Sequence, residues 1–113
     1  MNKTLGFHVF HNSATAESTG FAYNVPMDGV ELINIAFDIS NEGTFSATFQ
    51  ARVDLDSSPW VSIGATDLCT AEISQTATDA THLYQIYIGG IAALRVNVTS
   101  LDGTISCYSK IIG

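Results

Sequence analysis

Three histidines, His8, His11 and His82, are the side chains of this 113-residue sequence best suited to acid–base or metal chemistry. No spacing in the sequence singles out a Ser-His-Asp or Cys-His set. His8 and His11 stand three positions apart on an expected strand, where successive side chains alternate between faces. They should therefore point to opposite sides and not share a metal ion. We interpret them as surface histidines on an edge strand.

The carboxylates give a similarly weak signal for chemistry. Asp54 and Asp56 alternate at a polar turn, as calcium ligands do, but segment 54–59 lacks the ligand count of an EF-hand loop. We predict that these aspartates form the turn. A glycosidase needs two opposed carboxylates, and nothing selects a pair among the 11 acidic residues. A jelly-roll hydrolase or isomerase would need a cluster of His and Glu. The sequence thus predicts no catalytic residue, no metal, no cofactor and no enzyme.

Aromatic residues provide the only binding argument from residue type. Trp60 follows Pro59 at a turn, and Tyr84 and Tyr87 stand on opposite faces of one expected strand. Sugar-binding sandwiches stack ligands on exposed Trp and Tyr, so Trp60 and Tyr87 are the candidate binding residues of a carbohydrate-binding or host-adhesion module. In the alternative interpretation Trp60 is a packing anchor at a sandwich edge, and Tyr84 is buried.

The two cysteines, Cys69 and Cys107, are too few for a disulfide framework and too far apart for a CxxC knuckle. Both fall at inward-facing positions of expected strands. We expect buried free thiols, as in a cytosolic product, and a single disulfide remains the alternative. The segment Met1 to Phe10 lacks the apolar run of a signal peptide, and no stretch is long and apolar enough for a membrane helix.

Composition limits the function classes further. The length fits one domain, and 46% apolar with 13% charged residues is not the composition of a disordered chain. Four Lys and Arg against 11 Asp and Glu give a net charge of -7. A chain this acidic is not expected to bind nucleic acid or an anionic membrane.

Alternating apolar residues define the elements that must position these side chains. In 33–39 and 45–53 every second residue is apolar, the pattern of strands with one buried face. The polar turn 41–43 lies between them, and we predict a hairpin. Segments 94–99 and 105–111 alternate in the same way around the Asp-Gly turn at 101–103, which predicts a second hairpin.

Shorter strands are expected at 5–9, 21–25, 60–63, 69–73 and 84–88, with a loop over 12–20. No segment carries a convincing helical stripe. About eight or nine strands with turns every 8 to 12 residues indicate an all-β fold, a single antiparallel β-sandwich of jelly-roll or immunoglobulin-like type.

The exposed surface carries few charges, and Ser and Thr occupy most solvent-facing strand positions. Phe10, Leu83 and Tyr87 are expected to face solvent. They could form contacts between copies of the chain. The alternative is that one sandwich covers both faces of these strands.

A loose pattern of anchors runs through most of the chain. It comprises Val53-Asp54, Trp60, Tyr84, Gly89 or Gly90, Leu94-Arg95-Val96-Asn97-Val98 and Gly103. With these residues the sequence resembles small β-sandwich structural proteins of tailed bacteriophages, of the head-decoration, head-fibre or tail-accessory type. The match covers about residues 33–111, and residues 1–30 match nothing, which leaves them as a predicted N-terminal arm or docking segment.

This resemblance implies a non-enzymatic virion protein, assembled in the cytoplasm of the host bacterium. Its partners would be the major capsid or tail proteins of the same virion and further copies of itself. A trimer is expected if it decorates local three-fold points of a capsid. Arg95, the only charged residue of its expected strand, would then be a structural ion-pair partner.

Overall fold

The computed structural model describes residues 4–26, 32–54 and 56–113, and this part of the chain forms eleven β-strands. They are β1 (Thr4–Ala14), β2 (Tyr23–Asn24), β3 (Leu32–Ile39), β4 (Thr44–Arg52), β5 (Val61–Ser62), β6 (Ala65–Asp67), β7 (Ile73–Ser74), β8 (Thr76–Ala77), β9 (Leu83–Tyr87), β10 (Ala93–Asp102) and β11 (Ile105–Ile112). Among these residues no helix is long and apolar enough to span a membrane.

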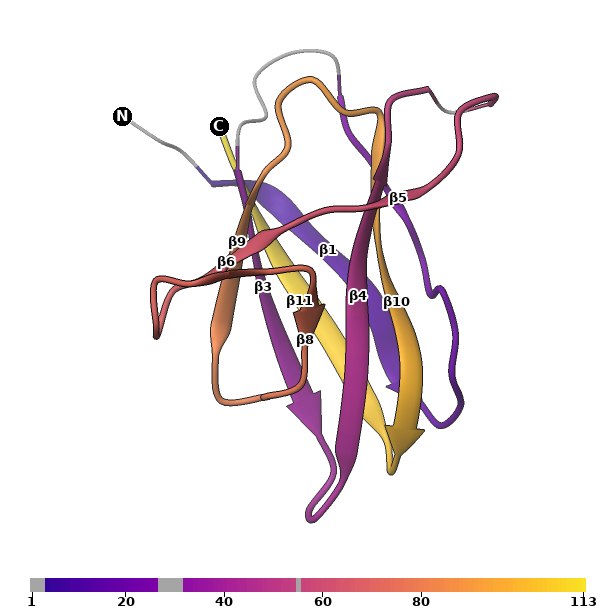
Figure 1. The fold of residues 1–113 in the computed structure, drawn as a ribbon, viewed down its shortest axis with the longest axis vertical. Helices are drawn as coiled ribbons and strands as arrows, with labels where there is room; N and C mark the ends of the chain where they lie inside the picture. The colour runs from indigo at the N-terminus through magenta and orange to yellow at the C-terminus, as the bar shows by residue number, and fades with distance from the viewer. Residues whose placement is uncertain (1–3, 27–31, 55) are drawn as a thin grey trace.

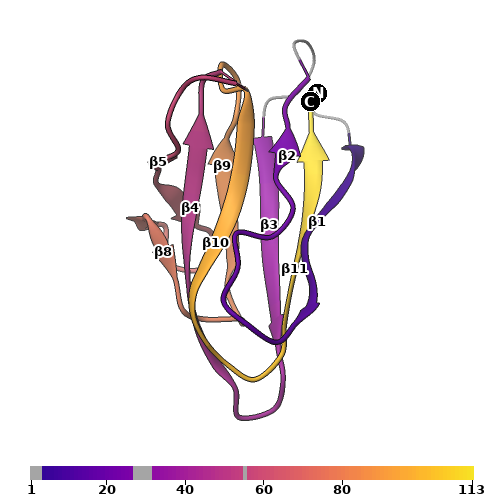
Figure 2. The ribbon, with the colours of Figure 1, turned by 90° about the vertical axis from the view of Figure 1, so that its right-hand side faces the viewer.

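The strands form two antiparallel sheets. Sheet A has six strands in the order β1-β11-β3-β9-β6-β7, and sheet B has five, in the order β2-β10-β4-β5 with β8 also paired to β4. The long strands of both sheets run along the long axis of the molecule, as the two views show (Figure 1, Figure 2). The prediction of an all-β antiparallel sandwich is confirmed. The strand count exceeds the expected eight or nine because four strands have only two residues each.

The two connections predicted as hairpins instead cross from one sheet to the other. β3 lies in sheet A while β4 lies in sheet B, and β10 lies in sheet B while β11 lies in sheet A. A period-two pattern identifies the buried face of a strand. The pattern is the same whether the next strand pairs beside it in one sheet or packs across the core in the other sheet. The hairpin predictions at 41–43 and 101–103 are therefore wrong, although both segments do connect two strands.

We call these two connections the arches; they are residues 40–43 between β3 and β4, and residues 103–104 between β10 and β11. They pack against each other at the lower end of the molecule in Figure 1. The Ser40 amide donates a hydrogen bond to the Thr104 carbonyl oxygen over 2.9 Å, and the Thr104 amide donates to Ser40 Oγ over 3.0 Å. A Cβ atom at Gly43 would lie 2.8 Å from the Asp102 carbonyl oxygen, closer than real Cβ atoms approach. Glycine is thus required at this contact between the arches.

The core lies between the sheets and is built by the predicted inward residues of the long strands. Among its members are Ile33, Ile35, Phe37, Phe45, Ala47, Phe49, Ala51, Leu94, Val96, Val98, Ile105, Cys107 and Ile111. Phe37, Phe45, Phe49 and Tyr84 form an aromatic cluster with ring centroids 4.9 to 6.3 Å apart. Val53 departs from the pattern and is 72% exposed, because β4 ends one residue earlier.

The edge strand β1 changes its buried face along its length. Phe7 and Val9 point outward and are exposed, whereas Phe10 is fully buried. The pairing of β1 with β11 shifts between Val9 and His11, as a β-bulge does when it inserts an extra residue. Phe10 follows the alternation of Phe7 and Val9 and points inward because those two residues point outward, so the prediction that Phe10 faces solvent is wrong.

The same bulge brings His11 into the core, where only 2% of the residue is exposed. Its Nε2 lies 2.6 Å from the Val96 carbonyl oxygen and so links β1 of sheet A to β10 of sheet B. The loop after β1 passes close over this ring at Gly20, whose φ of 63° suits glycine. The interpretation of His11 as a surface residue is wrong. His8 stays partly exposed, with Nε2 2.8 Å from the Phe21 carbonyl oxygen.

Two short predicted strands are corrected. The expected strand at 69–73 is replaced by β6 before it and β7 at its end, with a turn between them in which Ala71 adopts a φ of 63°. Cys69 lies in this turn and is exposed, not inward-facing. The expected strand at 21–25 shrinks to β2.

In the first 30 residues, β1 pairs with β11 and β2 with β10, so this segment supplies one strand to each sheet. The rest of the predicted arm, residues 1–3 and 27–30, lies outside the described residues.

Candidate functional site

The outer surface of sheet A carries large apolar side chains on four neighbouring strands. We call this surface face A and define it by Phe7 and Val9 on β1, Tyr108 on β11, Ala36 on β3, and Leu83 and Tyr87 on β9. Phe7 is 78% exposed and Tyr87 65%, and Val9, Tyr108 and Leu83 are each more than a third exposed. Exposed apolar residues are unremarkable singly, but a continuous group of them on one sheet face is typical of an interaction surface.

Strand register makes these side chains neighbours. Val9 pairs with Tyr108, Tyr108 with Ala36, and Ala36 with Leu83, so one row of outward residues crosses four strands. In the adjacent row Phe7 pairs with Lys110. Directly opposed side chains on one face lie in contact range, so this row and Phe7 form a continuous patch, and Tyr87 lies beyond Gln85 on β9.

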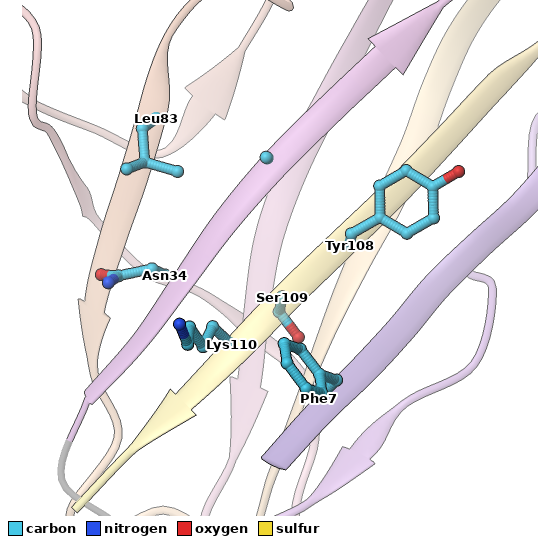
Figure 3. A pocket seen from close by; sticks show the side chains of 7 residues that line it. Phe7, Asn34, Leu83, Tyr108, Ser109 and Lys110 are labelled. Carbon is cyan, nitrogen blue, oxygen red and sulfur yellow. The ribbon is translucent and has the colours of Figure 1, made fainter. Parts of the chain in front are cut away.

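A shallow groove runs across face A, and Figure 3 shows its lining side chains. The lining residues are Phe7, Asn34, Ala36, Leu83, Tyr108, Ser109 and Lys110. Lys110 Nζ lies 6.0 Å from the centroid of the Phe7 ring, within reach of a weak cation–π contact. The groove is thus apolar at its two sides, with polar groups at its middle.

Face A is almost free of charge in a chain of net charge -7. On β1, β3, β9 and β11, Lys110 and Asp38 are the charged residues at described outward positions. Interface cores are depleted of charged residues in the same way, because burying an unpaired charge is costly.

The outer surface of sheet B holds the second candidate, Trp60, which is half-buried just before β5. The guanidinium carbon of Arg95 lies 4.3 Å from the centroid of the Trp60 ring, and that of Arg52 lies 5.2 Å away. Arginine stacks favourably on indole faces. The ring is therefore occupied by contacts within the chain.

The two arginines are held by oxygens that are not carboxylates. Arg95 Nε donates to Gln50 Oε1 over 2.8 Å, and Arg52 Nε donates to the Asp54 carbonyl oxygen over 2.7 Å. Partial burial, and then the positive charge of Arg52, lower the pKa of Arg95. The structure records no carboxylate partner for Arg95 among the residues it describes, so the predicted ion pair is replaced by an amide and an indole.

Trp60 and Tyr87 do not form one binding surface. Trp60 precedes β5 of sheet B, whereas Tyr87 ends β9 of sheet A. Tyr84 is buried in the core, as expected. The carbohydrate-binding alternative stays a prediction. A sugar would have to stack on Trp60 or on Tyr87, because the two side chains cannot contact one ligand together.

The carboxylates at 54–58 form a turn, as predicted. Asp54 Oδ1 accepts the Asp56 amide over 2.9 Å, and Asp54 Oδ2 accepts the Ser57 hydroxyl over 3.1 Å. These hydrogen bonds, led by the one from Asp56, lower the pKa of the Asp54 carboxyl. Both oxygens are thus engaged locally.

His82 is the histidine with the most polar surroundings, and no pattern in the sequence predicted them. Its Nδ1 lies 2.6 Å from Asp67 Oδ2, and its Nε2 lies 3.3 Å from Asp79 Oδ2. The hydrogen bond with Asp67 is the main cause that raises the pKa of His82. Asp67 stands 15 residues earlier, at the end of β6, whereas His82 precedes β9, so no local spacing revealed the contact.

Both cysteines are free thiols. Cys107 is fully buried in the core, and burial raises the pKa of its thiol well above the usual range. Cys69 is exposed beside Asp67, whose Oδ1 accepts the Cys69 amide over 2.9 Å. The expectation of free thiols is confirmed, and that of burial holds for Cys107 alone.

Comparison with known proteins identifies the fold but no family. No protein-family model and no curated protein matches the sequence. The solved structures that resemble it include SPBc2 prophage-derived protein YomS, with a TM-score of 0.87 and 13% identity over 100% of this chain and 96% of that one. PBSX exported protein XepA gives a TM-score of 0.85 and 20% identity over 99% of this chain and 38% of that one.

At these identities the likeness concerns the fold. It nevertheless agrees with the sequence resemblance, because both structural neighbours are phage-derived. The chain is therefore an antiparallel β-sandwich of a kind found in phage-derived proteins, and it matches nearly the full length of one of them.

Proposed function

We propose that this protein is a non-enzymatic structural component of a phage particle, and that face A is its packing surface. It would contact further copies of itself and the capsid or tail proteins of the same virion. The observation that carries the proposal is the nearly uncharged apolar row of Val9, Tyr108 and Leu83 with Phe7 beside it, and the exposed Tyr87 further along β9. Exposed on a lone domain, such a surface favours association, because burying it removes apolar area from water.

The fold likeness supports the phage context of this proposal. Both structural neighbours are phage-derived, and one is named as an exported protein. Within a particle the protein would decorate or stabilise a capsid, or serve as a tail accessory. Decoration at local three-fold points would make it a trimer, because cyclic symmetry matches the number of copies to the symmetry of the site.

Two measurements test the proposal. Mass spectrometry of gradient-purified particles from the phage or induced prophage that encodes the chain should find it in fixed ratio to a capsid or tail protein. Light scattering on the purified chain should give a stable oligomer. Detection only in the particle-free lysate would overturn the virion assignment, and a monomer at high micromolar concentration would overturn the role of face A in self-association.

A further inference from the structure

We propose that Asp67, Cys69 and His82 bind a zinc-class transition-metal ion at the end of β6. One ligand atom from each residue lies within 4.8 Å of the other two. The sequence predicted no metal site, because its analysis placed Cys69 in a buried strand and left His82 without neighbours. The fold brings the three residues together from β6, the turn after it, and the segment before β9.

The turn between β6 and β7 fixes two of the ligands. The Thr70 and Ala71 amides both donate to the Asp67 carbonyl oxygen, over 3.3 and 2.7 Å. The Cys69 amide donates to Asp67 Oδ1, which leaves Oδ2 as the oxygen that faces His82. The carboxylate is thus already oriented toward the imidazole by the main-chain amide of Cys69, which leaves the Cys69 thiol free for the metal.

A fourth residue, Asp79, holds the other side of the imidazole, as a second carboxylate commonly does in metal sites. His82 Nε2 lies 3.3 Å from Asp79 Oδ2, and the Thr81 amide and hydroxyl donate to Asp79 Oδ1 over 2.8 and 2.6 Å. A histidine that binds a metal through one nitrogen usually donates its other N–H to a carboxylate, which fixes the ring and its tautomer. This contact leaves Nδ1 as the nitrogen for the metal.

Metal binding would replace the hydrogen of the short contact between His82 and Asp67. Their atoms are 2.6 Å apart, whereas two ligands of tetrahedral zinc stand roughly 3.4 Å apart. A small rotation of the two side chains provides the difference, since 26% of the His82 side chain and 13% of the Asp67 side chain are exposed. The Nδ1 proton and the Cys69 thiol proton would pass to solvent, and water would fill the fourth position.

The donor set selects the metal class. One thiolate, one imidazole and one carboxylate suit Zn²⁺ or Co²⁺, whereas Ca²⁺ and Mg²⁺ require mostly oxygen ligands. The site would tie the turn after β6 to the start of β9 by a direct cross-link. The proposal is independent of the role of face A, since none of these residues belongs to that face.

Titration with Zn²⁺ alone, followed by calorimetry on the full chain in a non-chelating reductant, tests the site. We expect one equivalent to bind, and His82→Gln or Cys69→Ser to weaken the affinity at least about tenfold. Asp56→Asn, which removes an exposed acid elsewhere, is the matched control and should bind as the parent does. No binding up to millimolar Zn²⁺, or equal affinity in all four proteins, would overturn the proposal.

Two further readouts do not depend on affinity. Co²⁺ should give the absorption of a thiolate-bound tetrahedral ion, and Cys69→Ser should abolish its thiolate band. Zn²⁺ should also protect Cys69 from alkylation, measured by peptide mass spectrometry, while the buried Cys107 serves as the internal reference. Alkylation of Cys69 at the same rate with and without Zn²⁺ would contradict the proposed coordination.

Discussion

The two outer surfaces of the sandwich differ far more than the two inner ones. Both inner surfaces are apolar and form the core. Outside, the long strands of sheet B present Ser46, Thr48, Gln50, Arg52, Arg95 and Asn97, whereas sheet A presents face A. A sheet surface that contacts only water has no need of apolar side chains. The contrast therefore indicates that the outer surfaces of the two sheets contact different partners.

Placing charges on each surface should give the largest difference between them. Leu83→Asp combined with Tyr108→Asp puts two carboxylates in the middle of face A, and we expect association to weaken at least about 100-fold, because each side chain would be a buried anchor. Thr48→Asp with Asn97→Asp adds the same charge to sheet B and should change association less than about threefold. Light scattering across a dilution series measures the association of both double variants. Equal weakening in the two would contradict the proposed difference between the two surfaces.

Trp60, on the outer surface of sheet B, should matter for stability and not for association. Trp60→Ala removes the ring that Arg52 and Arg95 stack on, and we expect the free energy of unfolding to fall by about 1–3 kcal/mol. Denaturant unfolding measures the change, with association followed in parallel. Loss of association, or loss of binding to a glycan by an otherwise stable variant, would instead place a partner site on sheet B.

Exposed apolar residues of the two sheets should behave differently on removal. Phe7→Ser should leave the free energy of unfolding within about 0.5 kcal/mol of the parent value, since its ring is 78% exposed. It should weaken association about 5- to 30-fold. Val61→Ser is the matched change on sheet B, at a residue 57% exposed, and should affect neither quantity. A similar loss of association in both variants would argue for a general hydrophobic effect.

The smallest effect is expected where the chain passes from sheet B to sheet A, at His82. Its pKa is raised by the hydrogen bond with Asp67, so its contribution to stability is full below the unfolded pKa and is lost as pH rises through the folded one. Between pH 5.5 and 8.5, in the presence of a chelator, the melting temperature of the parent should fall more than that of His82→Gln. An equal or smaller fall in the parent would contradict this coupling.

Much of the fold follows from alternation, and the failures have identifiable causes. Parity correctly assigned the inward residues of β3, β4, β10 and β11, because burial imposes period two on any strand with one solvent-facing side. It could not choose between a hairpin and an arch, since both leave the same pattern. It also failed along β1, where Phe7 and Val9 are exposed and Phe10 is buried, and at His11, where a bulge shifts the phase by one residue without a sequence signal.

The candidate sites were predicted less completely than the fold. Leu83 and Tyr87 were placed on the exposed side because the parity of β9 is clear. Phe7 joins them only through the pairing of β1 with β11, a contact between the two ends of the chain. Asp67 ends β6 and His82 precedes the neighbouring strand β9, and the misassigned strand at 69–73 concealed the turn that positions Cys69.

The arches also determine when this protein can fold during its synthesis. Because β3 and β4 do not pair with each other, their long partner strands follow much later in the sequence: Ile33 pairs with Ile111, and Phe49 with Val96. Neither sheet is complete until residues 93–112 have left the ribosome. Chains dominated by such distant pairings fold in about milliseconds to seconds, and β3 and β4 each lack one neighbouring strand until β11 and β10 have been made. An interaction partner or chaperone that shields β3 and β4 during this interval would raise the yield of folded protein.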